Sequence, residues 1–291
     1  MTTLSERALL VHLRVPTWSG NMTDREVSDE ISETHKAERD AGSYTKVLVA
    51  RSFRRDVERT RTQAINVHKA LTLPWYDKGP RALNVQAHSA YTDAMRLNRH
   101  GYEAAVLQFM SIYPEQPMQE AEKRLGSMFN ADDYPEADDI RERFSFKVEI
   151  SPLPESGDFR ASLSASSLKA IKAEYEKQQD ERIKAALNNV FQRVCDVTEK
   201  MAERLRVYKP AAGSETSKDR FHDSLIYNVR DVADLLPTLN ITGDKRLDAL
   251  QKQLANLASE EPAILRNDEH LRNKTADEAE KLFQKVSSMF S

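Results

Sequence analysis

The amino-acid sequence predicts a predominantly α-helical α+β protein, in which a small antiparallel β-sheet is covered by helices and followed by a long central helix. Three patterns support this fold class. Apolar residues occupy alternate positions over 8–15 and again over 144–163, which is typical of strands. From Leu168 to Tyr208 they recur every three or four positions, which is typical of a helix. The sheet is therefore predicted as a hairpin joined by an N-terminal strand.

The clearest alternation covers residues 144–151, before Pro152, Pro154 and Gly157 impose a loop. One predicted face holds Phe144, Phe146, Val148 and Ile150, and the other holds Ser145, Lys147, Glu149 and Ser151. Alternation resumes over 159–163, so the two segments together predict a β-hairpin. An isolated hairpin is marginally stable in water, so a third strand is expected, and residues 8–15 fit best. Residues 1–163 would then form an N-terminal α+β region with a three-stranded sheet.

Helices are expected between these strands. Thr23 and Glu26 have the spacing of a capping box, so one helix should begin near Asp24 and stop near Gly42. Others are predicted over 52–71, over 81–113 until Pro114, and around 118–128.

Residues 164–291 are predicted to be helical. The stripe from Leu168 to Tyr208 has a mean spacing of about 3.6 residues and would extend about 60 Å. A helix of this length should span two parts of the protein or pack in an oligomer interface, as coiled-coil helices do. Residues 210–217 have the composition of a linker. Three further helices are predicted near 218–236, ended by Pro237, and near 244–258 and 269–290.

Composition favours a soluble protein of the cytoplasm. Charged residues make up 31% of the 291 residues and hydrophobic residues 40%, which is enough for a core. Cys195 is the only cysteine, so the chain can form no internal disulfide. The N-terminus lacks the pattern of a signal peptide, and no apolar run reaches the roughly 18 residues of a membrane span. A membrane partner is therefore not expected.

Several short motifs occur in one order over almost the whole chain. They are LLVHLRVPTWSG at 9–20, Leu73-Pro74-Trp75, Arg143-Phe144-Ser145-Phe146, Gly157-Asp158-Phe159-Arg160, and LLPTLNITGD at 235–244. In this combination the chain resembles a family of bacteriophage and prophage proteins called domain of unknown function 3150. The resemblance implies a phage or prophage origin and a place in the cytoplasm of the bacterial host cell. It implies no catalytic residue, because none is established for the family.

The sequence contains no recognisable catalytic motif. The seven histidines show no H-x-x-x-H spacing, and neither nucleotide-binding glycine motif occurs. The pairs Asp132-Asp133 and Asp138-Asp139 could bind a hard cation, although such residues more often cap helices and load a first turn with negative charge. We therefore predict no catalytic residue, no metal site and no cofactor.

Charge is unevenly distributed along the chain. Residues 44–113 carry 11 Lys and Arg against 5 Asp and Glu, whereas residues 114–143 carry 4 against 9. A basic helix can follow phosphates, and nearby aromatic rings can stack on bases. The candidate nucleic-acid-binding residues are Lys46, Arg51, Arg54, Arg55, Arg59, Arg61, Trp75 and Tyr76. The alternatives are a solvated face, or a face that docks on the acidic stretch 114–143 of the same molecule.

These observations favour a non-enzymatic assembly or adaptor protein of phage DNA metabolism, oligomeric through its long helix. Its expected partners are copies of itself and phage or host proteins of DNA metabolism. The alternative is a single-stranded nucleic-acid-binding protein that uses the basic helix near residues 51–61. A third class, a metal-dependent hydrolase, depends on the aspartate pairs alone.

Overall fold

The computed structural model describes residues 3–155, 165–209 and 221–290. Contacts between Cα atoms divide the chain into two compact units. Unit 1 comprises residues 1–12, 69–91 and 150–291, and unit 2 comprises 13–68 and 92–149. This division differs from the two consecutive regions, 1–163 and 164–291, that the sequence predicts. The predicted fold class is confirmed, since helices dominate and accompany a small antiparallel sheet and one long helix.

Three strands form the main sheet: β1 (Ala8–Arg14), β4 (Arg81–Asn84) and β5 (Lys147–Pro152). The predicted N-terminal strand is confirmed as β1, and it lies in the middle of the order β4-β1-β5. β4 was predicted as the start of a helix, and this was wrong. It pairs antiparallel with β1, with Ala8 opposite Asn84. Pairing across some seventy residues overrides local helical spacing here. The second strand of the predicted hairpin, 159–163, lies outside the described residues.

Unit 2 contains most of α3 (Arg51–Leu71) and α4 (His88–Ile112). The helix predicted over 52–71 is confirmed, and the next one begins at His88 instead of residue 81 because β4 and a short 3-10 turn precede it. Both helices hold the segment that follows β1. Arg61 Nε donates to the Val15 carbonyl at 2.8 Å, and the Tyr102 hydroxyl donates to the Pro16 carbonyl at 2.7 Å.

The predicted faces of residues 144–151 are only partly right. Phe146 is 8% exposed, and its ring lies 6.0 Å from that of Tyr102 on α4, whereas Ile150 is 43% exposed. Every residue of β5 is half-buried or exposed. The buried Phe146, which packs on α4, lies just before the strand begins. The alternation therefore located the strand but did not identify which of its residues a helix covers.

The remaining elements of unit 2 are short: β2 (Asn21–Asp24), α2 (Arg25–His35), β3 (Tyr44–Val47), α5 (Glu115–Leu125) and α6 (Ala137–Glu142). The sequence did not predict the antiparallel pair of β2 and β3. Gly20 precedes it with a φ of 66°, in the left-handed region that favours glycine. Its carbonyl accepts from the backbone N–H groups of Leu48 and Val49 at 2.8 and 3.0 Å.

α2 begins where the sequence indicates, but with a different cap. Asp24, not Thr23, accepts a hydrogen bond from the Val27 N–H at 3.1 Å. The helix ends at His35, before the predicted Gly42, because Lys36 adopts a left-handed conformation with a φ of 52°.

Unit 1 contains a bundle of helices built on α7 (Ala165–Val207), which confirms the predicted long helix. α8 (Ser224–Leu239) and α11 (Glu269–Ser287) pack on α7, and α9 (Lys245–Leu257) packs on α8 and α11. The short helices α1 (Leu4–Arg7) and α10 (Pro262–Asn267) also belong to unit 1. Pro237 lies inside the last turn of α8 and does not end it, contrary to prediction, and α10 was not predicted. The predicted linker 210–217 lies outside the described residues.

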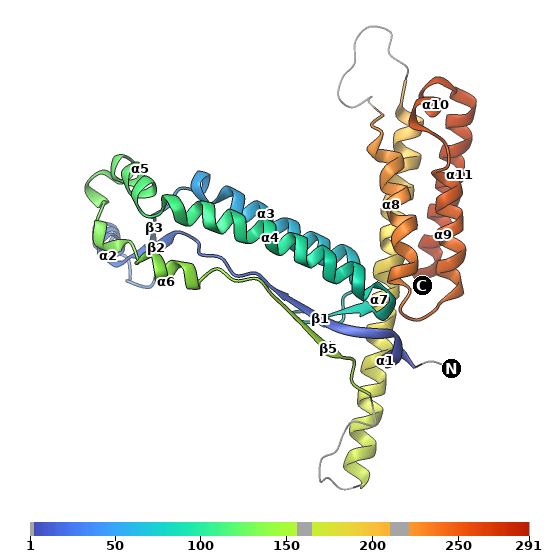
Figure 1. Cartoon of the computed structure of the whole chain (residues 1–291), viewed down its shortest axis with the longest axis horizontal. Coiled ribbons are helices and arrows are strands. Elements are labelled where there is room, and N and C mark those ends of the chain that lie inside the picture. The colour runs from blue at the N-terminus through green and yellow to red at the C-terminus, as the bar shows by residue number, and fades with distance from the viewer. Residues whose placement is uncertain (1–2, 156–164, 210–220, 291) are drawn as a thin grey trace. The chain divides into compact units, whose positions relative to one another are not determined.

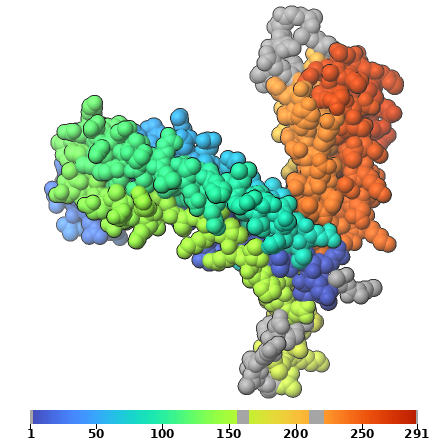
Figure 2. Space-filling model, in the orientation of Figure 1, coloured from blue at the N-terminus to red at the C-terminus, as the bar shows by residue number. Residues whose placement is uncertain are grey.

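Only part of the long apolar stripe on α7 is buried. Ala186, Val190, Met201 and Leu205 are at most 1% exposed in the core of unit 1, whereas Ile171 is half-buried. In Figure 1, α8, α9 and α11 lie along one part of α7, and its N-terminal part extends past them. Figure 2 shows α8, α9 and α11 as one continuous surface. Among the described residues, no helix combines the length and apolarity needed to cross a bilayer.

Candidate nucleic-acid interface

An exposed row of three arginines runs along α3. Arg51, Arg55 and Arg59 are spaced by four residues, so they lie one turn apart over about 12 Å. All three are exposed, and Arg51 and Arg59 side chains keep 82% and 67% of their accessible surface. The opposite side of the helix buries Val57 and Ala64. The amphipathic pattern of α3 thus fixes which of its basic residues face solvent.

The row is only loosely neutralised. Arg51 Nε lies 2.8 Å from Glu58 Oε2, and Arg59 Nη2 lies 3.3 Å from Asp56 Oδ1. Arg55 forms no ion pair among the described residues. Exposed pairs of this kind contribute about 0–1 kcal/mol, so a stronger anion such as a phosphate could replace the carboxylates. Further along, polar side chains continue the same shallow groove, namely Thr62, Gln63 and Asn66.

Lys46 has a different environment. It is 5% exposed, and its ammonium lies 2.6 Å from Asp24 Oδ2 and 2.8 Å from Asp133 Oδ2. The hydrogen bond from Lys46 is the main cause that lowers the pKa of Asp24 below 3.8, helped by the Val27 N–H. Burial disfavours the ammonium, but its hydrogen bonds to Asp133 and Asp24 outweigh this and raise the pKa of Lys46 above 10.5. Lys46 therefore joins β3 to the acidic stretch 114–143. For this residue the structure agrees with the alternative prediction, in which the basic stretch docks on the acidic stretch of the same molecule.

Arg54 and Arg61 also hold the fold together. Arg54 is largely buried, donates to Glu58 Oε1 at 2.7 Å, and packs its guanidinium against Gly20. Burial lowers its pKa despite the neighbouring Glu58 carboxylate. The Arg61 guanidinium donates a hydrogen bond to the Val15 carbonyl. Neither guanidinium extends the exposed row.

The two aromatic candidates belong to unit 1 and not to unit 2. Trp75 is 3% exposed and lies in the core of unit 1, so its ring is not available for stacking. Tyr76 is 38% exposed, and the Arg182 guanidinium lies 4.6 Å from its ring centroid. Of the eight candidates, only Arg51, Arg55 and Arg59 share one open surface.

The paired aspartates lie in different local settings. Asp133 accepts from Lys46, and Asp138 and Asp139 lie in the first turn of α6. Within the described residues, no group of three His, Cys, Asp or Glu side chains could hold a metal ion. The role of Asp24 was not predicted from the sequence. No local pattern links Asp24 to Lys46, or to Asp133, which lies more than a hundred residues further along the chain.

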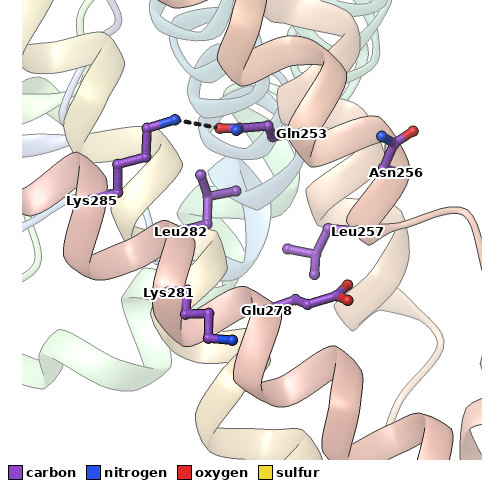
Figure 3. Close-up of a pocket in the computed structure, with 7 residues that line it drawn as sticks. All are labelled: Gln253, Asn256, Leu257, Glu278, Lys281, Leu282 and Lys285. Atoms are coloured by element: carbon purple, nitrogen blue, oxygen red, sulfur yellow. Dashed lines mark hydrogen bonds between the residues drawn. The ribbon is translucent and has the colours of Figure 1, made fainter.

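A groove with a small apolar floor lies between α9 and α11 (Figure 3). Leu257 and Leu282 face each other across it, and Lys285 Nζ donates to Gln253 Oε1 at 3.0 Å. Its other charged side chains, Glu278 and Lys281, have opposite signs. This groove offers contacts for packing and no convergent charge.

Comparisons of the chain with protein-family models, with curated proteins and with solved structures give no match. The resemblance to the phage family therefore remains a prediction.

Proposed function

We propose that the protein is a non-enzymatic adaptor that holds single-stranded nucleic acid by its phosphates through Arg51, Arg55 and Arg59. The observation that carries the proposal is the exposure of these three guanidiniums in one row on α3. Guanidinium groups bind phosphate oxygens through paired N–H donors, and successive turns of a helix can contact successive phosphates. Such contacts bind all sequences alike.

The biological setting of the proposal is phage DNA metabolism in the cytoplasm of a bacterial host. This part rests only on the resemblance of the motifs at 9–20 and 235–244 to the phage family. The expected partners are then phage or host proteins that process DNA. An adaptor would bring one of them to a strand held on α3.

The salt dependence of binding tests the proposal. Affinity for a labelled oligothymidylate, measured by fluorescence anisotropy between about 50 and 200 mM salt, should fall with a log–log slope near −0.7 per phosphate contacted. Replacing Arg51, Arg55 and Arg59 together with Gln should flatten this slope by about 2 units. Stability should change little, because the three side chains are exposed.

The control variant removes the same charge elsewhere in unit 2. Arg25, Arg39 and Arg96 are exposed and lie outside α3, and their triple change to Gln should leave the slope nearly intact. Equal flattening by both triple variants would mean that net charge, not the row, governs binding. No binding by the unmutated protein at low salt would refute the proposal for α3.

We also propose that the protein self-associates through the N-terminal part of α7. Leu168, Ile171 and Tyr175 continue the apolar stripe, yet all three are only half-buried. Ile171→Glu should therefore reduce the molar mass measured by light scattering without lowering the unfolding midpoint. An unmutated protein that is monomeric across the micromolar range would contradict this proposal.

A further inference from the structure

An open pocket in unit 1 carries two guanidiniums and an aromatic ring. It lies between the connector 74–77, the start of β4 and one side of α7, and it encloses about 500 Å3. This volume is in the range of small-molecule sites. All the residues that line it belong to unit 1, so the pocket does not depend on α3 of unit 2.

Arg81 supplies a fixed positive charge that no ion pair neutralises within the described residues. Its Nε donates to Thr72 Oγ1 at 2.7 Å and its Nη2 to the Thr72 carbonyl at 3.0 Å. Arg193 Nη2 donates to the same carbonyl at 3.1 Å. Two guanidiniums thus converge on one oxygen, and neither forms an ion pair with a carboxylate among the described residues. Burial and then the charge of Arg193 lower the pKa of Arg81 to about 10, so an anion near Arg81 would relieve this repulsion.

A flat surface completes the pocket. The Arg182 guanidinium lies 4.6 Å from the Tyr76 ring centroid, and its Nη2 donates to Gln178 Oε1 at 3.3 Å. The amide thereby fixes the guanidinium over the ring, again without an ion-paired carboxylate in the described part of the chain. Tyr76 remains 38% exposed, so a planar ligand can reach it.

Two carboxylates line the same pocket, those of Asp77 and Glu181. Neither is within ion-pair distance of a cation among the described residues. Carboxylates accept hydrogen bonds from the amino groups of adenine, cytosine and guanine. The pocket therefore offers donors for an anion, a stacking surface for a planar ring, and acceptors for an amino group on that ring.

From these features we propose that the pocket binds a nucleoside 5′-phosphate. The phosphate accepts from Arg81, the base stacks on Tyr76 beside Arg182, and its amino group donates to Asp77 or Glu181. This site is separate from the row on α3, and it does not rest on the function proposed for that row.

Calorimetric titration of the full chain with adenosine 5′-monophosphate, adenosine and inorganic phosphate tests the proposal. The nucleotide should bind at least tenfold more tightly than either fragment, because it engages both Arg81 and Tyr76. Quenching of Trp75, which lines the pocket, should report the same affinity. Inorganic phosphate that binds as tightly as the nucleotide would overturn the proposed ligand class, and no heat with any of the three would overturn the site.

Variants assign the two parts of the ligand. Arg81→Gln should weaken nucleotide binding about tenfold and leave adenosine binding unchanged, whereas Tyr76→Ala should weaken both. Since Arg81 also holds Thr72, Arg182→Gln provides a second variant, which should weaken nucleotide binding in a protein with an unchanged unfolding midpoint. Wild-type affinity in a folded Arg182→Gln protein would refute the pocket.

Two controls separate this site from others. Arg206→Gln removes an exposed arginine of unit 1 that pairs with Asp277 and Glu280, and it should leave nucleotide affinity unchanged. The triple change of Arg51, Arg55 and Arg59 to Gln should also leave it unchanged. Loss of nucleotide binding in the triple variant would place the nucleotide on α3 and overturn the pocket. If the triple variant loses only its affinity for single strands and still binds the nucleotide, the pocket and the row on α3 are independent sites.

Discussion

The basic stretch from residue 46 to residue 61 divides into a buried region at β3 and an open region on α3. At β3, Lys46 lies between Asp24 and Asp133 and is 5% exposed. On α3, Arg55 is exposed and has no ion pair among the described residues. Both residues count equally in a charge tally of the sequence. The difference shows that local charge indicates where cations are, and that tertiary contacts decide what each cation does.

The two regions should therefore respond to different measurements. A buried ion pair contributes little net stability, but removing one partner leaves an uncompensated charge in the interior. An exposed cation contributes little to stability either way, but it remains available to a polyanion. Substitution of the buried Lys46 at β3 should change unfolding, and substitutions in the exposed row on α3 should change binding.

The largest effect is expected from Lys46→Met. This change leaves the buried Asp24 carboxylate and the half-buried Asp133 carboxylate without their ammonium, which should lower the free energy of unfolding by about 3 kcal/mol. Urea denaturation followed by circular dichroism would measure the loss. Arg55→Met is the matched control on the open face, and we expect a change of no more than about 0.5 kcal/mol. Similar losses in both variants would remove the distinction between the two regions.

Acid should reveal the same cluster. The folded pKa of Asp24 is lowered, chiefly by its hydrogen bond from Lys46, so its contribution to stability is present above its ordinary pKa of 3.8. That contribution is lost as the pH falls through the lower folded value. The pKa of Lys46 is raised, so its contribution is present below 10.5 and is lost as the pH rises through the higher folded value. Between these limits the cluster should contribute a constant amount.

Asp24→Asn provides the comparison for this pH dependence. Unfolding free energies measured from neutral pH into the acid range should fall more steeply for the unmutated protein than for the variant. Other carboxylates titrate in both proteins, so the difference between the two curves isolates Asp24. Parallel curves would contradict the proposed protonation of this residue on acid unfolding.

Adjacent residues 54 and 55 allow the finest structural test. Arg54 is 13% exposed, bonds Glu58 and packs on Gly20, whereas Arg55 points to solvent. Arg54→Gln should lower the free energy of unfolding by about 1–2 kcal/mol, and Arg55→Gln should not change it measurably. Strand affinity should show the opposite order. If Arg55→Gln destabilises the protein more, the assignment of the faces of α3 is wrong.

The sequence predicted the elements that depend on interactions between near neighbours, and it missed elements that depend on residues far apart in the chain. The periodicity of α3, α7 and α9 is set by near neighbours along the chain, and all three helices were predicted within a few residues. β4 and the pair of β2 and β3 depend on partners far along the chain, and they were missed. Pro237 does not end α8, which continues to Leu239 although proline has no N–H to donate to the Ala233 carbonyl.

The candidate site could be predicted only in outline. Spacing of four residues placed Arg51, Arg55 and Arg59 on one helix face, and exposure agrees with that face. No local pattern could show that Lys46 meets Asp133, or that Trp75 is buried in unit 1. The pocket beside Tyr76 was invisible for the same reason, because α7 supplies Arg182 from a hundred residues away.

The smallest predicted effect concerns the carboxylate that lies within the row itself. Glu58 accepts from both Arg51 and Arg54, and its side chain is 30% exposed, so it competes with a phosphate for Arg51. Exposed pairs of this kind contribute about 0–1 kcal/mol. Glu58→Gln should therefore tighten single-strand binding by up to about fivefold in fluorescence anisotropy at low salt. Asp93→Asn removes the same charge from an exposed pair on α4 and should tighten binding less. An equal gain in both variants would mean that the strand responds to the net charge of the protein and not to the release of Arg51 from Glu58.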